Sequence, residues 1–66
     1  MSLSDNLRAL RKQKGYSQEQ LAERLNVSRQ AVSKWENGAS DPSTSNLLAL
    51  AKLYGISAED LLKEVE

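Results

Sequence analysis

Apolar residues recur every three or four positions along this chain, the spacing that places them on one face of a helix. Five such segments are predicted. The apolar residues of the first three are Leu7 and Leu10, then Leu21 and Leu25, then Ala31, Val32 and Trp35. Those of the last two are Leu47, Leu48, Leu50, Ala51, Leu53 and Tyr54, then Leu61, Leu62 and Val65. Because no segment alternates apolar and polar residues as a strand does, the pattern predicts an all-α fold.

Serine, glycine and proline residues mark the predicted ends of these helices. The predicted N-terminal caps are Ser4, Ser17, Ser28, Ser43 and Ser57, and Gln20 completes a capping box with Ser17. Gly15, Gly38 and Gly55 each follow a helical segment, where helix ends adopt positive φ. The first helix is expected to end near Lys14, with Arg8, Arg11 and Lys12 largely outside. Pro42 lies in the only extended connection, and residues 1–66 are predicted to form one domain.

Residues 17–37 are predicted to form two short helices joined by a tight turn. Asn26 stands where the chain needs a left-handed residue, a conformation that Asn tolerates better than most residues. Val27 is expected to fill the angle between the two helices. Trp35 shares helical spacing with Ala31 and Val32, so we predict that it anchors the core.

The outer face of the second helix in this pair carries amide and basic side chains but no acid. Gln30, Ser33, Lys34 and Asn37 recur on that face at helical spacing, and Arg29 lies beside them. An ordinary solvated face is the alternative, but such a face usually mixes Glu with Lys. These side chains instead match the donors and acceptors of base edges and phosphates. Side chains near the start of such a helix reach bases, so the predicted base readers are Ser28, Arg29, Gln30, Ser33 and Lys34.

The chain resembles the Cro and Xre family of helix-turn-helix regulators, which includes the lambdoid phage repressors. The resemblance rests on QEQLAERLNVSRQAVSKWENG, on Pro42 and on LLALAKLYGISAEDLL, and it covers nearly the whole chain. It implies a compact five-helix, lambda-repressor-like domain that places its third helix in the major groove of DNA. The chain departs from the family at Asn26, where glycine is usual. Since Asn also reaches the left-handed conformation, we expect the turn to survive with a little strain.

The resemblance also implies roles for individual residues. Arg29, Gln30 and Lys34 match the principal base-reading positions of the family. Ser17, Gln18 and Asn37 match positions that grip the phosphate backbone, and Gln18 lies in the first turn of a helix, where free N–H groups attract anions. For Ser17 and Asn37, a role in capping or in a turn explains the residue at least as well, and both roles are compatible.

Arg11 and Glu36 are paired by the same resemblance, because the family joins an arginine at this place to the matching glutamate. Such a pair would tie the first helix to the end of the third. Lys12 and Lys14 are expected to add only diffuse attraction for DNA.

The charges are divided between the two halves of the chain, although the formal net charge is zero. Residues 1–35 hold seven basic and three acidic residues, a net charge of +4. Residues 36–66 hold two basic and six acidic residues, a net charge of −4. A basic reading half is therefore followed by an acidic half, which we expect to face away from DNA or toward a protein partner.

Composition narrows the chemistry further. A chain of 66 residues has room for one small domain and not for a second, ligand-sensing one. It has no cysteine and no histidine, so we expect no disulfide, metal or cofactor. No spacing places a nucleophile beside a base, which argues against an enzyme. The longest apolar stretch, residues 47–53, contains Lys52 and is too short for a bilayer, so we expect a cytoplasmic protein without a membrane partner.

The sequence thus predicts a transcription regulator that binds double-stranded DNA sequence-specifically. We expect a repressor that occupies its operator as a homodimer. The alternative is an antitoxin or another protein-interaction module, whose acidic half would mask a basic partner while the helix-turn-helix binds its own operator.

Overall fold

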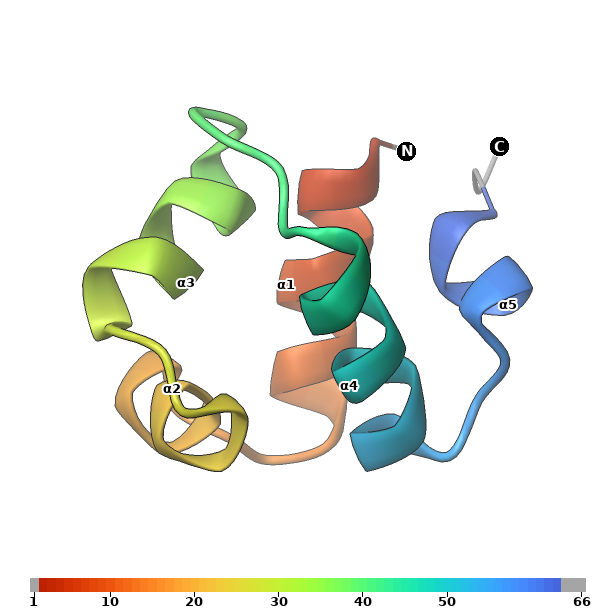
Figure 1. Cartoon of the computed structure of the whole chain (residues 1–66), viewed down its shortest axis with the longest axis horizontal. Coiled ribbons are helices and arrows are strands. Elements are labelled where there is room, and N and C mark those ends of the chain that lie inside the picture. Colours follow the sequence, from red (N-terminus) through yellow and green to blue (C-terminus); the bar gives the residue numbers. More distant parts are fainter. Residues whose placement is uncertain (1, 64–66) are drawn as a thin grey trace.

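The computed structural model of the chain describes residues 2–63, which form five helices and no strand. The helices are α1 (Leu3–Gln13), α2 (Gln18–Leu25), α3 (Arg29–Asn37), α4 (Thr44–Tyr54) and α5 (Ala58–Leu62). In Figure 1, α2 and α3 lie on one side of α1, and α5 lies on the other side. The predicted five-helix, all-α architecture is confirmed. None of the helices in this range is both long and apolar enough to cross a membrane.

Serine side chains begin every helix. The hydroxyl oxygens of Ser17, Ser28, Ser43 and Ser57 accept hydrogen bonds of 3.0–3.2 Å from the backbone N–H three residues later, as predicted. The predicted Ser4 cap of α1 is wrong, because Ser2 caps this helix and Ser4 lies in its first turn. The reason is Asp5, whose carboxylate accepts from the Ser2 N–H while Ser2 Oγ accepts from the Asp5 N–H. A cap at Ser4 would have had the apolar Leu7 in place of that returning carboxylate.

The turn between α2 and α3 has the predicted left-handed residue. Asn26 adopts φ 57° and ψ 44°, and its N–H bonds back to the last turn of α2. Val27 follows, partly buried against the core, and its N–H donates to the carbonyl of Ala22 at 3.0 Å. Gly38 and Gly55 end α3 and α4 in the same region of backbone space. Asn26 therefore ends α2 in the same left-handed conformation in which Gly38 and Gly55 end their helices.

The core lies where α1, α2, α3 and α4 converge, and α5 closes it. Its buried apolar residues are Leu7, Leu21, Ala22, Val32, Trp35, Leu50, Ala51, Tyr54 and Leu61. Trp35 is only 6% exposed, which confirms its predicted role as the core anchor. Each fully buried leucine contributes about 1.5–3 kcal/mol relative to an exposed one.

Two leucines predicted to be buried are exposed. Leu48 is 57% exposed and Leu62 is 50% exposed. Each is a neighbour in sequence of a core-facing residue, and successive residues are about 100° apart around a helix. On α4 the stripe of Leu47, Leu50, Ala51 and Tyr54 already fills the inward face, and on the single turn of α5 Leu61 does so. The predicted burial of Val65 lies outside the described residues.

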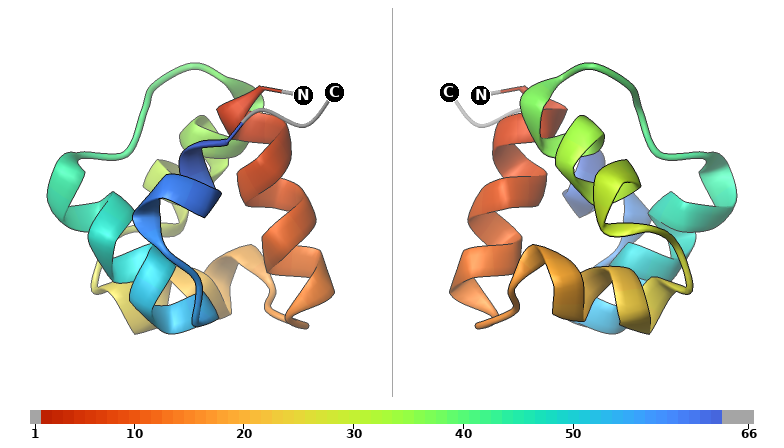
Figure 2. Two further views of the ribbon diagram at one scale, coloured as in Figure 1. Left: turned by 90° about the vertical axis from the view of Figure 1, so that its right-hand side faces the viewer. Right: turned by 90° about the vertical axis from the view of Figure 1, so that its left-hand side faces the viewer.

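A buried amide joins the end of α5 to α1. Asn6 is 7% exposed, and its side-chain N–H donates to the carbonyl of Lys63 at 2.6 Å. The left view of Figure 2 shows α5 lying beside α1, with which it is in contact. This short last helix is thus held by one polar contact as well as by Leu61.

Candidate nucleic-acid interface

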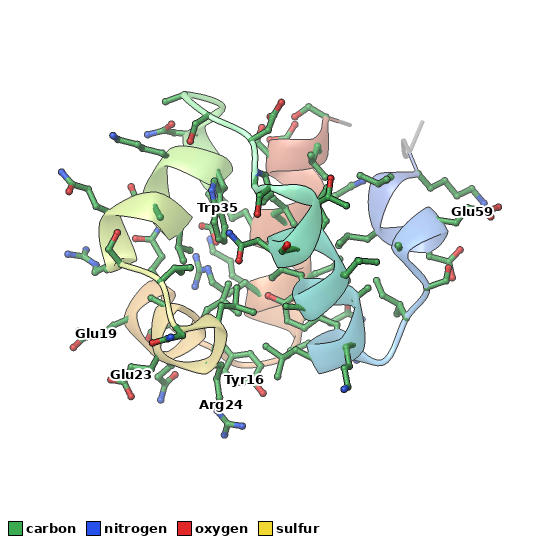
Figure 3. All side chains as sticks on the ribbon, in the orientation of Figure 1. Tyr16, Glu19, Glu23, Arg24, Trp35 and Glu59 are labelled. Atoms are coloured by element: carbon green, nitrogen blue, oxygen red, sulfur yellow. The ribbon has the colours of Figure 1, made fainter. Side chains whose placement is uncertain are left out.

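The outward face of α3 presents the predicted base-reading side chains. Arg29, Gln30 and Lys34 are exposed, and Ser33 is half-buried. On the opposite face Val32, Trp35 and Glu36 are buried. Figure 3 shows Trp35 pointing from α3 toward the helices at the centre of the molecule. Because these three inward residues fix the rotation of α3 about its axis, the exposed side chains project away from the core in a defined direction.

Ser28 stands at the start of α3, beside Arg29 and Gln30. Its hydroxyl oxygen accepts a hydrogen bond from the N–H of Ala31 at 3.1 Å, and the residue is exposed. The five predicted base readers therefore all lie on one short helix or at its cap. Ser28 is the cap, three of the others are exposed, and Ser33 is half-buried. Their contacts with bases remain a prediction.

Arg11 and Glu36 form a buried ion pair between α1 and α3. Arg11 Nε lies 2.6 Å from Glu36 Oε2, and Arg11 Nη2 donates to Glu36 Oε1 at 3.1 Å. The side chains are 11% and 2% exposed. The implied pairing is confirmed, and the expectation that Arg11 lies largely outside is wrong. The two-pronged geometry suits a guanidinium and a carboxylate, which is why the charges tolerate burial here.

Three further contacts extend this pair into a polar cluster, defined as Arg8, Arg11, Gln18 and Glu36. Gln18 Nε2 donates to Glu36 Oε1 at 3.2 Å, so the first turn of α2 touches α3. Arg8 Nη2 donates to the backbone carbonyl of Glu36 at 3.0 Å, and Arg11 Nη1 donates to the carbonyl of Tyr16 at 2.8 Å. The cluster joins α1 to α2 and α3, and these last two helices with their caps carry the predicted base and phosphate contacts.

The parts played by Arg8 and Gln18 in this cluster were missed in the sequence. The signal for Arg8 was present, because residues three apart on a helix share a face and Arg8 lies three residues before Arg11. For Gln18 there was none, since its contact with Glu36 depends on the angle between α2 and α3. One N–H of the Gln18 amide is used by Glu36, and a second N–H is left for a phosphate.

Tyr54 lies near the cluster, in the core. Burial raises the pKa of its phenol to about 12, and the negative charge of Glu36 adds to the rise. Its ring centroid is 6.4 Å from that of Tyr16. Among the described residues its hydroxyl oxygen has no hydrogen-bond partner. The phenol therefore stays neutral at physiological pH.

Ser17 and Asn37 both have the local roles expected of them. Ser17 caps α2, and its own N–H donates to Gln20 Oε1 at 2.9 Å, which completes the capping box. Asn37 is exposed at the end of α3, where its Oδ1 accepts from the N–H of Ala39 at 2.9 Å. Capping and turn formation are confirmed for the two residues. Their phosphate contacts stay predictions.

A hollow of about 300 Å³ is lined by Gly15, Tyr16, Gln20, Glu23 and Arg24. The Arg24 guanidinium sits 5.8 Å from the centroid of the Tyr16 ring. Figure 3 shows Tyr16, Glu23 and Arg24 close together at the lower edge of the molecule. Within residues 2–63, no group of three or more acidic side chains is arranged to hold a metal ion. The hollow contains none of the predicted reading residues.

Two helices joined at a left-handed turn, the second with an exposed amide and basic face, define a helix-turn-helix domain. The sequence model of the helix-turn-helix family matches residues 7–61. The chain belongs to this family, and the resemblance to Cro and Xre regulators is confirmed.

Known relatives of the chain are transcription regulators by name. It is 41% identical over 66 residues to the HTH-type transcriptional activator BcrR of Enterococcus faecalis, covering 100% of this chain and 32% of BcrR. It is 39% identical to the HTH-type transcriptional regulator ImmR of Bacillus subtilis, covering 100% of this chain and 52% of ImmR. The chain thus spans about a third to a half of the length of these two relatives.

A solved structure of the c2 repressor of phage P22 with a synthetic operator is similar over nearly the whole fold. The two chains superpose with a TM-score of 0.87 and are 36% identical, with 96% of each chain covered.

Proposed function

We propose that this chain is a DNA-binding domain of a transcription regulator and reads duplex DNA with α3 in the major groove. The observation that carries the proposal is the exposed face of Arg29, Gln30 and Lys34 on a helix whose rotation is fixed by buried residues. The similar P22 c2 repressor was solved with operator DNA, which supports the same partner for this chain. The proposal assigns no catalytic activity and no cofactor.

Base reading is assigned to the start of α3. An arginine at position 29 can donate two hydrogen bonds to guanine O6 and N7, and Gln30 can pair with adenine N6 and N7. Lys34 lies one turn further along and can donate to guanine acceptors or to a phosphate. Ser28 and Ser33 have short side chains, whose hydroxyls can accept or donate a hydrogen bond where the helix lies close to the bases. Each good two-pronged contact discriminates against a wrong base by about 1–3 kcal/mol.

Backbone contacts are assigned to Ser17, Gln18 and Asn37. Ser17 and Gln18 lie at the start of α2, where unpaired N–H groups and the helix dipole favour a phosphate. Glu36 holds the Gln18 amide at 3.2 Å, which limits the positions its free N–H can take. A phosphate bound there would be fixed relative to α3, because Glu36 belongs to α3. Contacts of this kind set the register of a protein on DNA without specifying sequence.

A homodimer on a two-fold symmetric operator is the expected assembly, since one α3 spans too few base pairs to select a site. Such dimers place their recognition helices about 34 Å apart. Operator occupancy by itself suffices for repression, so we favour a repressor. The DNA partner implies a protein that works in the cytoplasm. In this proposal the acidic half of the chain faces away from DNA or toward a protein partner. In the antitoxin alternative that partner is a basic toxin, and the helix-turn-helix still binds DNA.

Selection of bound sites from random duplex DNA tests this proposal. We expect enrichment of a symmetric site whose halves are about one helical turn apart. Two exposed lysines provide a matched pair of variants, because Lys34 and Lys52 each lie in the last turn of their helix. Lys34→Ala should weaken binding to the selected site and Lys52→Ala should not. Failure to enrich any sequence would contradict the proposal, and equal losses for the two variants would contradict the assigned face.

A further inference from the structure

Asn37 is followed directly by Gly38 at the end of α3. Asparagine before glycine is the pair most prone to lose its side-chain ammonia, because glycine has no side chain to hinder attack by its own backbone nitrogen. We propose that Asn37 is a site of spontaneous deamidation, and that its conversion to a carboxylate weakens DNA binding. The chemical half of this inference stands alone, and the effect on DNA rests on the proposed function.

The side chain of Asn37 is held in a pose that favours the reaction. It is exposed, and its Oδ1 accepts a hydrogen bond of 2.9 Å from the N–H of Ala39, two residues further on. A bond of this span curls the side-chain amide over the intervening Gly38 peptide. The same N–H lies where negative charge develops on Oδ1 when the amide carbon is attacked, as donors do in an oxyanion hole.

The reaction consumes only water. The Gly38 nitrogen, after loss of its proton, bonds to Cγ of Asn37 and forms a five-membered succinimide. The Cγ–Nδ2 bond breaks, and the nitrogen, which already carries two hydrogens, takes one proton from solvent and leaves as ammonia. Water then opens the ring at Cγ, which gives aspartate, or at the backbone carbonyl, which gives isoaspartate and moves the main chain onto the side chain.

The helix end limits the rate of this reaction. The Gly38 N–H donates to the carbonyl of Lys34, so the attacking nitrogen is engaged until the last turn opens. The N–H groups of Ala39 and Ser40 also reach that carbonyl, at 3.0 and 3.3 Å. Helix ends fray, so the bond opens without global unfolding. We therefore expect deamidation in the folded protein to be slower than in the unfolded chain but not abolished.

A carboxylate at position 37 would act against DNA binding in two ways. Asn37 is assigned to contact a DNA phosphate, and a carboxylate there would repel the phosphate, whereas the amide N–H can donate a hydrogen bond to it. The carboxylate would also place negative charge at the C-terminal end of α3, where the helix dipole is already negative. Both effects are independent of base sequence, so operator and non-operator DNA should lose affinity together.

The other asparagines provide internal controls. Asn26 is the closest match, since it is also exposed and also ends a helix, but the β-branched Val27 follows it. Asn46 is half-buried in the first turn of α4 before Leu47. Residues 35–52 form one tryptic fragment that contains both Asn37 and Asn46, so a single peptide compares the two.

In the first experiment the intact chain is kept in warm, mildly alkaline buffer, and the masses of this fragment and of the tryptic fragment 25–29, which contains Asn26, are followed over time. We expect the mass gain of amide-to-acid conversion at Asn37, located by fragment ions, with Asn26 and Asn46 unchanged. A denatured sample should convert faster. Conversion of Asn26 at the rate of Asn37, or an unmodified Asn37 after the denatured sample has fully converted, would overturn the proposed site.

The second experiment compares fresh and aged protein in DNA binding. The fresh Asn37→Asp variant should bind operator about tenfold more weakly than the wild type. Aged wild type should approach that value, while aged Asn37→Gln should keep the affinity of its fresh sample, because glutamine cyclises far more slowly. Complete conversion with unchanged affinity would overturn the effect on DNA. If fresh wild type binds no duplex, the proposed function fails, while the mass result still decides the chemistry.

Discussion

Removal of Arg11 should destabilise the fold far more than its single charge suggests. The Glu36 side chain is 2% exposed in the wild type, and Arg11→Ala removes both guanidinium contacts of its carboxylate, which leaves the Gln18 amide as its remaining side-chain partner. Stranding one charge of a buried pair costs about 3–5 kcal/mol. A chain of 66 residues has a total stability of about 3–10 kcal/mol. The variant should therefore lose between about a third and all of its stability.

Urea unfolding followed by far-ultraviolet circular dichroism measures this loss. Arg24→Ala is the matched control, because Arg24 is an exposed arginine whose recorded contact is with the Tyr16 ring. It should cost less than about 1 kcal/mol. A second variant replaces both Arg11 and Glu36 with methionine and removes the stranded charge. It should recover most of the stability, as apolar replacements of buried pairs do. If Arg11→Ala unfolds within about 0.5 kcal/mol of the wild type, the cluster does not hold the helices together.

Three further sets of variants test other features. Arg29→Ala and Gln30→Ala should each cost about 1–3 kcal/mol of operator affinity and relax base preference, measured on a panel of operator changes, whereas Gln18→Ala should weaken all sequences alike. Burial raises the pKa of Tyr54 to about 12, so folding stability should fall as pH rises from about 10 to 12 and Tyr54→Phe should lack that slope in alkaline melts. Asn26→Ala should lower stability by about 1 kcal/mol in thermal melts and Asn26→Gly should change it little, because at φ 57° alanine is more strained than asparagine and glycine is not strained.

The features predictable from the sequence are those set by neighbours along the chain. Caps depend on a serine and on the residue three positions later, and the Asn26 turn depends on one backbone conformation. The wrong cap at α1 came from overlooking Asp5, which was itself a local signal. The exposure of Leu48 and Leu62 was harder to predict, because it depends on how much of each helix its neighbours cover.

The residues of the candidate site were likewise easier to predict than the tertiary contacts that hold them in place. The face of α3 follows from helical period alone, so Arg29, Gln30 and Lys34 could be assigned before any fold was known. The Gln18 contact with Glu36 joins residues 18 positions apart on two helices, and no local pattern encodes their crossing angle. Sequence therefore indicates which side chains are available for DNA, and tertiary packing decides which of them are held in place.

The polar cluster links stability and recognition in this small domain. Its members come from α1, α2 and α3, whereas α4 and α5 supply apolar backing through Leu50, Ala51 and Leu61. A change inside the cluster should shift the proposed phosphate contact of α2 relative to the proposed reading face of α3, since Gln18 and Arg11 bind the same carboxylate. A change in the apolar backing lowers stability without altering that relation. Glu36→Gln, if it folds, should thus impair DNA binding more than a core variant of equal stability does.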